Sequence, residues 1–290
     1  MHRLRYLITA TGIVVSLMAK VRASLRVLIS IALTCGSVPV FAVEIADDRG
    51  VSVLLDAPAR RVVALAPHLT EILFHIGGGG RLVGVMDHSD FPAAAQSLPR
   101  VGTHSRLDIE AILALKPDLI VGWGSGNPTE DIALLERLGL PVFMSEPRAL
   151  ADISTLMRRL GALIDEAPFA RQRAADFENG VNELAVRYSS RRRLRVFYQV
   201  WEQPLYTLNR EHIVSELIAD CGGANIFADL AGLSPVVSLE AVIARDPQVI
   251  VGGSSTDAIP TWVKRWREWP SVTAVRLGQI HVINADGSKL

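Results

Sequence analysis

Two stretches of fifteen residues match each other without a gap: DIEAILALKPDLIVG at residues 108–122 and SLEAVIARDPQVIVG at residues 238–252. Each opens with a residue type that caps helices, followed two positions later by a glutamate. A proline then separates an apolar run with helical spacing from a β-branched run that ends in glycine. This order predicts a short helix followed by a buried strand. The chain therefore carries one helix–strand unit twice, 130 residues apart.

A second pair of matching segments occurs in the same order along the chain. TEIL at residues 70–73, with a glycine pair at 77–78, corresponds to SELI at residues 215–218, with a glycine pair at 222–223. Thr70 is expected to cap a helix that runs to Ile76 and stops at the glycines. Because only two copies are present, the sequence predicts two related lobes rather than a solenoid.

Short apolar runs alternate with helical runs through both halves of the chain. Strands are expected at residues 61–66, 82–85, 119–121, 141–144 and 195–200, with helices at 109–115 and 131–138 between them. Strands joined by helices of this length indicate parallel βαβ units. From Leu150 to Ser189 the chain has only helical spacing. The predicted fold is therefore α/β, with Rossmann-like lobes at 43–149 and 191–290 bridged by a helical segment at 150–190.

The amino terminus has the pattern of an export signal. Three cations, Lys20, Arg22 and Arg26, precede an apolar run at residues 27–33, and VFA at 40–42 places small side chains at a cleavage site. Residues 1–42 are therefore predicted to be a signal peptide, and the mature protein is expected in the periplasm. Translation could also start at Met18. A retained membrane anchor is the alternative, but the arginines interrupt the apolar stretch that a membrane span needs.

Composition and motifs exclude several classes of function. The 290 residues contain 30 basic and 30 acidic side chains, so the formal charge of zero argues against binding to nucleic acid. Ser125 lies in GWGSG at 122–126, but the glycines that a nucleophile elbow needs are replaced by Trp123 and Asn127. No His/Cys cluster with the spacing of metal ligands occurs in the sequence. We expect no enzyme activity, no bound metal and no cofactor.

The loops that follow the predicted strands hold the candidate ligand residues, because α/β sheets bind ligands at the carboxyl ends of their strands. Pro67 follows the first strand, His88 lies in the loop after the second, and Trp123 and Trp201 each follow a strand in a different lobe. Asp286 follows the last strand. The tryptophans could cover a large flat ligand or simply cap the core.

Other aromatic and titratable residues leave two interpretations open. His88 and His104 could bind a ligand or be ordinary polar surface. Trp262 and Trp266 are one helical turn apart, which favours core packing. Glu110 and Glu240 occupy the same place in the two repeats, where a carboxylate stabilises the helix amino terminus. One such glutamate per lobe could also dock on a two-fold symmetric partner.

The chain resembles the cobalamin-binding proteins of ABC importers over residues 60–286. The motifs that carry the resemblance are APHLTE at 66–71, SDFP at 89–92, LKPD at 115–118, WGSGN at 123–127 and CGGANIF at 221–227. The resemblance implies a class III periplasmic binding protein, monomeric, that carries cobalamin as a transported ligand to an ABC transporter permease dimer. It also implies that Glu110 and Glu240 dock on that permease.

Two positions depart from the family pattern. His88 and His104 stand where relatives place aromatic residues against the corrin ring, whereas Trp123 matches. Haem or a ferric siderophore is therefore the alternative ligand. Relatives also continue beyond the position of Asp286 with a ligand-contacting loop and a final helix, whereas this sequence stops at Leu290. The resemblance thus implies a truncated second lobe and leaves Cys221 without a partner.

Overall fold

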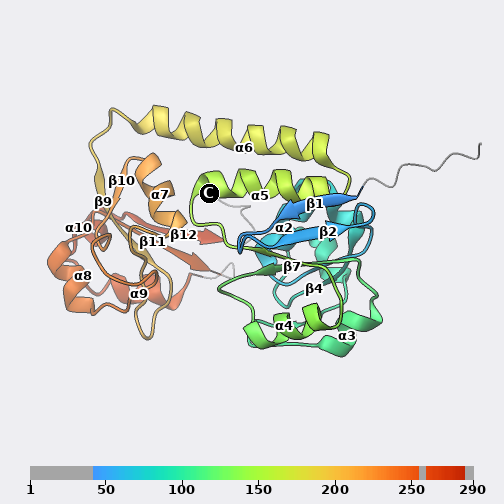
Figure 1. The fold of residues 1–290 in the computed structure, drawn as a ribbon. Helices are drawn as coiled ribbons and strands as arrows, with labels where there is room; N and C mark the ends of the chain where they lie inside the picture. Colours follow the sequence, from blue (N-terminus) through green and yellow to red (C-terminus); the bar gives the residue numbers. More distant parts are fainter. Residues whose placement is uncertain (1–41, 255–258, 285–290) are drawn as a thin grey trace, which may run out of the picture. The chain divides into compact units, whose positions relative to one another are not determined.

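Two four-stranded parallel sheets form the framework of the computed structural model, which describes residues 42–254 and 259–284 (Figure 1). The first sheet has the order β4-β3-β7-β8 and the second has the order β10-β9-β11-β12. In chain order both sheets run second, first, third, fourth. The strands are β3 (Val62–Ala64), β4 (Leu82–Val85), β7 (Leu119–Trp123), β8 (Val142–Ser145), β9 (Leu194–Gln199), β10 (Gly223–Asn225), β11 (Val249–Ser254) and β12 (Ile280–Asn284).

Helices connect these strands, and two short hairpins complete the chain. The hairpins pair β1 (Val43–Ala46) with β2 (Ser52–Leu55), and β5 (Gly102–Thr103) with β6 (Arg106–Leu107). The helices are α2 (Pro67–His75), α3 (Ile109–Ala114), α4 (Thr129–Arg137), α5 (Leu150–Leu163), α6 (Ala167–Tyr188), α7 (Ile213–Asp220), α8 (Leu239–Arg245), α9 (Thr261–Trp266) and α10 (Thr273–Arg276), with 3₁₀ turns η1 (Gly78–Arg81) and η2 (Ala93–Ser97). Within residues 42–254 and 259–284, no helix combines the length and hydrophobicity that crossing a membrane requires.

The fifteen-residue repeat folds as the sequence predicts. Asp108 accepts a hydrogen bond from the amide of Ala111 at 2.9 Å and starts α3, and Ser238 accepts one from Ala241 at 3.2 Å and starts α8. These side chains pair with amides that have no partner within their own helix. Each helix then leads into a central strand, β7 or β11, so the duplication seen in the sequence is present in the structure.

The two lobes share a further contact at the end of the repeat helix, α3 or α8. In each lobe it is made by an arginine at the beginning of the first strand of the sheet. The guanidinium of Arg61 donates to the carbonyl of Leu115 at the end of α3, and Arg195 donates to the carbonyl of Asp246 at the end of α8. Exposed carbonyls at a helix carboxyl terminus favour such cations. The arginines Arg61 and Arg195 therefore play the same structural part in both lobes.

The expectation for Thr70 is wrong. Helix α2 starts at Pro67, and Thr70 lies buried inside it, where its hydroxyl donates to the carbonyl of Ala66 at 3.3 Å and to Ser89 Oγ at 3.2 Å. Proline is favoured in the first turn because its φ angle is already helical and its missing N–H has no partner there. The proline therefore starts the helix three residues before the threonine.

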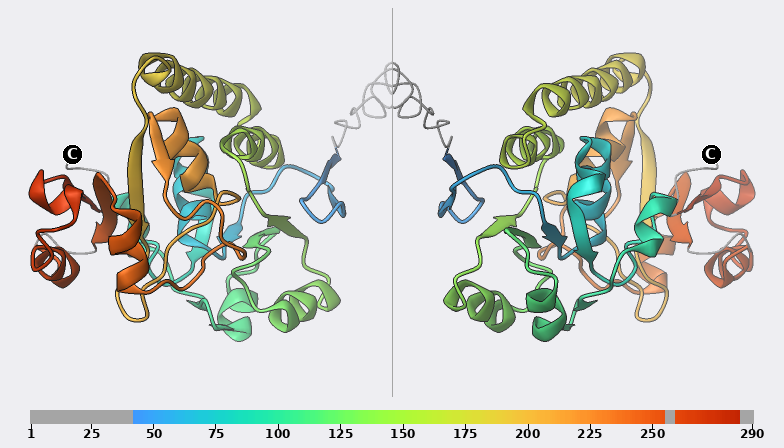
Figure 2. Two further views of the ribbon diagram at one scale, coloured as in Figure 1. Left: turned by 90° about the vertical axis from the view of Figure 1, so that its left-hand side faces the viewer. Right: turned by 90° about the vertical axis from the view of Figure 1, so that its right-hand side faces the viewer.

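The bridging segment consists of two helices that pack side by side, α5 and α6 (Figures 1 and 2). A Cβ on Gly161 would lie 2.1 Å from the Cβ of Ala170, so glycine permits the close approach of the two helices. Arg158 donates two hydrogen bonds to Glu178 at 2.9 and 2.7 Å, and Ser154 donates a third at 2.6 Å. These bonds lower the pKa of Glu178 to about 2. Helix α6 is the long bridging helix that the sequence predicts, and it leads directly to β9.

Apolar side chains cover both faces of the first sheet and pack around Phe197 in the second lobe. Trp266 is 4% exposed, packs on Phe197, and donates a hydrogen bond to Gln199 Oε1 at 2.7 Å. Trp262 is 7% exposed, and its indole nitrogen donates to the carbonyl of Gly253 at 3.1 Å. The predicted core role of Trp262 and Trp266 is confirmed.

Replacing either helix cap should destabilise the protein. We expect Asp108→Ala and Ser238→Ala each to lower the free energy of unfolding by about 1 kcal/mol, because each leaves a helix amide without its partner. Urea denaturation measures the loss. The exposed Arg192→Ala is the control and should change stability by less than about 0.5 kcal/mol. Losses no larger than the control would contradict the assignment of these caps.

Candidate ligand-binding site

The loops at the carboxyl edge of the first sheet are joined to one another by hydrogen bonds. Asn127 donates through Nδ2 to the carbonyl of Leu65 at 2.7 Å, which ties the loop after β7 to the segment after β3. The amide of Gly124 donates to the carbonyl of Ser145 at 3.0 Å, which ties the same loop to β8. The bond between Thr70 and Ser89 joins the loop after β4 to α2. Four strands therefore contribute to one connected edge.

Trp123 is the last residue of β7 and lies at the centre of this edge. Its amide donates to Asn127 Oδ1 at 2.7 Å, and its side chain is 37% exposed. A Cβ on Gly126 would lie 1.8 Å from Cε3 of the indole, so the ring rests directly on the glycine backbone. The WGSGN loop therefore presents a partly exposed aromatic ring, which could contact a large flat ligand.

Ser125 is held by the carboxylate of Glu146. Glu146, in the loop after β8, accepts hydrogen bonds from the amide of Ser125 at 2.7 Å and from its hydroxyl at 3.1 Å. Arg148 approaches the same carboxylate at 3.7 Å. The arrangement fixes the loop beside Trp123 and places a half-buried negative charge at the edge of the sheet.

His68 follows Pro67 in the chain after β3, and the sequence assigned it no role at the site. It lies in the first turn of α2, and its ring packs edge-on against Trp123 with 5.2 Å between centroids and 89° between planes. Its Nε2 atom is buried and has no hydrogen-bond partner within the described part of the chain. Burial lowers the pKa of His68 to about 4, while the charge of Glu146 acts in the opposite direction. The imidazole is therefore neutral at pH 7.

The depressed pKa of His68 predicts a pH-dependent stability. In the unfolded chain, His68 has its ordinary pKa of 6.5 and is protonated below that pH. In the folded chain, it is protonated only below about pH 4. The unfolded state then binds more protons, so the free energy of unfolding falls as pH decreases through this window, by at most about 3 kcal/mol. Urea denaturation of the wild type and of His68→Phe between pH 7 and 4.5 gives the free energy of unfolding at each pH. The wild type should lose more of this free energy than His68→Phe over that range, and the difference measures the contribution of His68. Parallel curves would contradict it.

Of the other residues predicted from the first lobe, Pro67 lies at the same edge as Trp123, whereas His88 and His104 are exposed in loops. Pro67 opens α2 at the same edge as Trp123 and is half-buried. His88 is exposed in the loop after β4, with a left-handed φ of 64°. His104 is exposed in the turn between β5 and β6. Within the described residues, no hydrogen bond or ring contact joins either histidine to Trp123. The role of His88 and His104 therefore stays a prediction.

In the second lobe, Trp201 lies after β9 and is 64% exposed, with its indole nitrogen bonded to the carbonyl of Gln203 at 3.1 Å. The next residues in the chain, Glu202 and Gln203, line a pocket of about 250 Å³ to which Trp201 does not contribute. Glu202 lines this pocket and is bonded to Thr261 at 2.9 Å and paired with Arg265 at 3.4 Å. The pocket is lined by Gln199, Glu202, Gln203, Leu205, Leu239, Trp262, Arg265, Trp266 and Trp269.

Three remaining expectations concern parts of the chain outside this edge. The predicted signal peptide, apart from Ala42, and the predicted ligand residue Asp286 lie outside the described residues. Glu110 and Glu240 are both exposed in the first turns of α3 and α8. The pKa of Glu240 is lowered by hydrogen bonds from its own amide and from Ser238. Each lobe thus carries one accessible carboxylate at the same place in the repeat.

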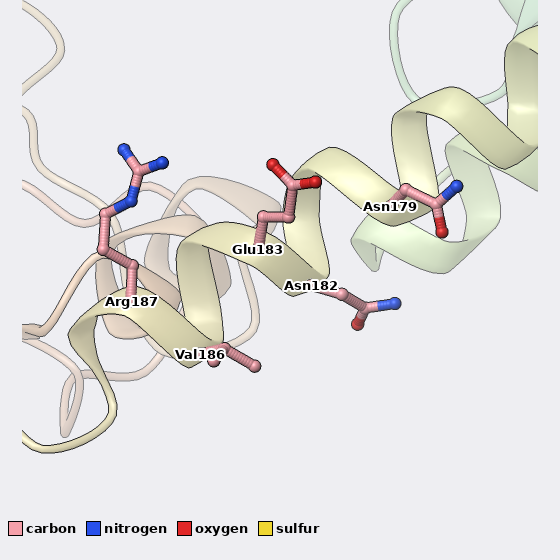
Figure 3. Close-up of a pocket in the computed structure, with 5 residues that line it drawn as sticks. All are labelled: Asn179, Asn182, Glu183, Val186 and Arg187. Carbon is pink, nitrogen blue, oxygen red and sulfur yellow. The ribbon is translucent and has the colours of Figure 1, made fainter.

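A surface hollow of about 510 Å³ on α6 is a poor candidate for a ligand site. Asn179, Asn182, Glu183, Val186 and Arg187 line it, and Figure 3 shows these side chains leaving the helix in different directions. One helix cannot enclose a ligand without a second wall. Within residues 42–254 and 259–284, no group of three or more His, Cys, Asp or Glu side chains could hold a metal ion.

Comparison with known proteins gives consistent results. Residues 62–286 match the family model described as periplasmic binding protein. The vitamin B12-binding protein of Vibrio cholerae serotype O1 is 40% identical over 230 residues, which cover 79% of this chain and 82% of that protein. The vitamin B12-binding protein of Yersinia pestis is 37% identical over 229 residues, covering 78% and 82%.

Solved structures agree with the sequence relatives. The crystal structure of the periplasmic vitamin B12 binding protein of Vibrio cholerae matches with a TM-score of 0.71 at 38% identity, over 79% of this chain and 89% of that one. The periplasmic heme-binding protein RhuT from Roseiflexus sp. RS-1 matches with a TM-score of 0.67 at 25% identity, over 77% and 89%.

These matches confirm the predicted fold class of two α/β lobes bridged by a long helix and the predicted periplasmic localisation. The relatives are named as binding proteins, which supports a binding role without catalysis. The repeated sheets, the connected loops around Trp123 and the match over residues 62–286 lead to one assignment. The chain belongs to the periplasmic binding protein family.

Proposed function

We propose that this protein captures cobalamin in the periplasm and delivers it to an ABC importer. The observation that carries the proposal is the 40% identity to a vitamin B12-binding protein over 79% of the chain. The geometry at the carboxyl edge of the first sheet supports it. Trp123 presents a partly exposed indole there, and no metal or nucleophile is needed for a ligand that is carried unchanged.

The ligand site is proposed to include both sheet edges. Pro67, His88, His104 and Trp123 would contribute from the first lobe, and Trp201 and Asp286 from the second. Trp123 and Trp201 are both exposed aromatic residues at strand ends, as the covering of a macrocycle requires. Cobalamin is then a transported ligand rather than a cofactor.

The partner is proposed to be a transporter permease dimer, with the binding protein acting as a monomer. Glu110 and Glu240 support this because they are exposed, occupy equivalent turns of α3 and α8, and carry negative charge. A two-fold symmetric partner with two cationic sockets would match one glutamate from each lobe.

Titration of the purified protein with cyanocobalamin, haemin and ferric siderophores tests the proposed ligand. Calorimetry and absorbance changes should show saturable binding of cyanocobalamin with a Kd in the micromolar range or tighter. Absence of cobalamin binding at micromolar concentrations would overturn the proposal. Binding of haemin instead would favour a role in haem capture. The 25% identity to a heme-binding protein supports this as the second candidate function.

A further inference from the structure

The buried imidazole nitrogen of His68 is an unusual feature of this site. Among residues 42–254 and 259–284, Nε2 finds no hydrogen-bond partner, and it is buried. A polar atom taken out of water without a hydrogen bond costs free energy, and native structures rarely leave one so. The imidazole thus retains an unused hydrogen-bonding capacity next to the proposed ligand site.

His68 lies next to the aromatic ring of Trp123 at the proposed ligand site. The imidazole belongs to the first turn of α2, and the indole of Trp123 packs against it at 5.2 Å. That indole rests on Gly126 and is more than one third exposed. Because Nε2 is buried, a ligand can reach it only if a neighbouring group such as this partly exposed ring shifts slightly.

The charges around His68 define which ligand group fits. The imidazole is neutral at pH 7, because burial lowers its pKa to about 4, and the charge that acts on it is the carboxylate of Glu146, which Arg148 approaches at 3.7 Å. A ligand carboxylate would find no positive charge on the imidazole and would be repelled by Glu146. A carboxamide is uncharged and both donates and accepts, so it pairs with Nε2 in either tautomer of the ring.

We propose that Nε2 of His68 is a hydrogen-bonding group for the ligand and selects a carboxamide edge over a carboxylate edge. This inference rests on the proposed function, since the corrin ring of cobalamin carries amide side chains whereas haem carries carboxylates. Because Nε2 is already desolvated in the free protein, a hydrogen bond from the ligand does not replace one that Nε2 made to water. Binding then gains close to the full benefit of that bond, about tenfold to a hundredfold in affinity.

The test measures Kd by calorimetry for cyanocobalamin, for cobalamin monocarboxylic acids with one hydrolysed amide, and for haemin. His68→Phe keeps an aromatic ring against Trp123 but removes the nitrogen. It should bind cyanocobalamin about tenfold to a hundredfold more weakly, and the preference for cyanocobalamin over the acid should shrink to the part that repulsion by Glu146 supplies. His68→Asn, a neutral polar side chain, should recover part of the affinity. His75→Phe is the matched control, because His75 is an exposed histidine of the same helix that contacts Arg173, and its affinity should match the wild type.

A second measurement on the wild-type protein keeps the proposal testable if His68→Phe does not fold. With ¹⁵N-labelled histidine, the Nε2 resonance of His68 should shift when cyanocobalamin binds. If the wild type binds cyanocobalamin but its Nε2 resonance does not move, or if folded His68→Phe binds within threefold of the wild type, the role of His68 is refuted while the proposed function stands. If the wild type does not bind cyanocobalamin, both are refuted.

Discussion

Reversing both proposed docking charges, Glu110→Lys together with Glu240→Lys, is expected to abolish transporter-dependent uptake of cobalamin while leaving its Kd unchanged. Each glutamate is exposed at the start of its helix, so lysine can be accommodated without disturbing the core. Opposing a cationic socket with a cation replaces attraction by repulsion at two places. Losing a close charge pair costs about 2–5 kcal/mol at an interface, so two reversals should weaken association by more than a hundredfold.

Uptake in a strain that depends on this protein, and calorimetry on the purified variant, measure the two effects separately. The control is Glu44→Lys combined with Glu268→Lys, which gives the same change in net charge. Both glutamates are exposed, Glu44 in β1 and Glu268 in the second lobe. Uptake should persist in the control. A fall in ligand affinity in the Glu110 and Glu240 variant would mean instead that these residues shape the ligand site.

Placing a methyl group under Trp123 should weaken the binding of cobalamin. In Gly126→Ala the new Cβ would overlap the indole, since it would lie 1.8 Å from Cε3, and the ring must leave its position. An aromatic side chain at the centre of an interface commonly contributes 2 kcal/mol or more, so we expect about a thirtyfold loss of cobalamin affinity. Trp123→Ala should produce a loss of the same size.

Gly80→Ala provides the matched control, because its Cβ would meet nothing within 4 Å. The affinity of this variant should equal that of the wild type. Calorimetry gives the affinities, and circular dichroism shows whether each variant is folded. If Gly126→Ala binds as tightly as Gly80→Ala, the orientation of Trp123 does not matter for binding.

Much of the fold follows from local sequence patterns. The repeat at residues 108–122 and 238–252 predicted α3 with β7 and α8 with β11, because a cap, a proline and a β-branched run act over a few residues. The position of Thr70 could be misread for the same reason. Two adjacent signals, Pro67 and Thr70, compete to start α2, and the chain pattern alone does not rank them.

The site was predicted only in part. Pro67 and Trp123 were predicted from their places after strands, and the structure puts both at one connected edge. His68 was located after the same strand but given no role, and Glu146 was not predicted, although both follow strands of the same sheet. Their importance depends on contacts with residues 123 and 125, and nothing in the local sequence indicates which side chains will meet.

The sequence by itself determined the duplication, the parallel α/β class and the alternation of strands and helices, because these depend on spacing along the chain. Only the tertiary structure decided that the nitrogen of His68 is buried with no partner in the described part of the chain, that the pKa of His68 is depressed, and that Gly126 supports the indole of Trp123. Burial and close contact arise when strands distant in sequence become neighbours in a sheet. The chemistry of the site therefore appears only after the chain has folded.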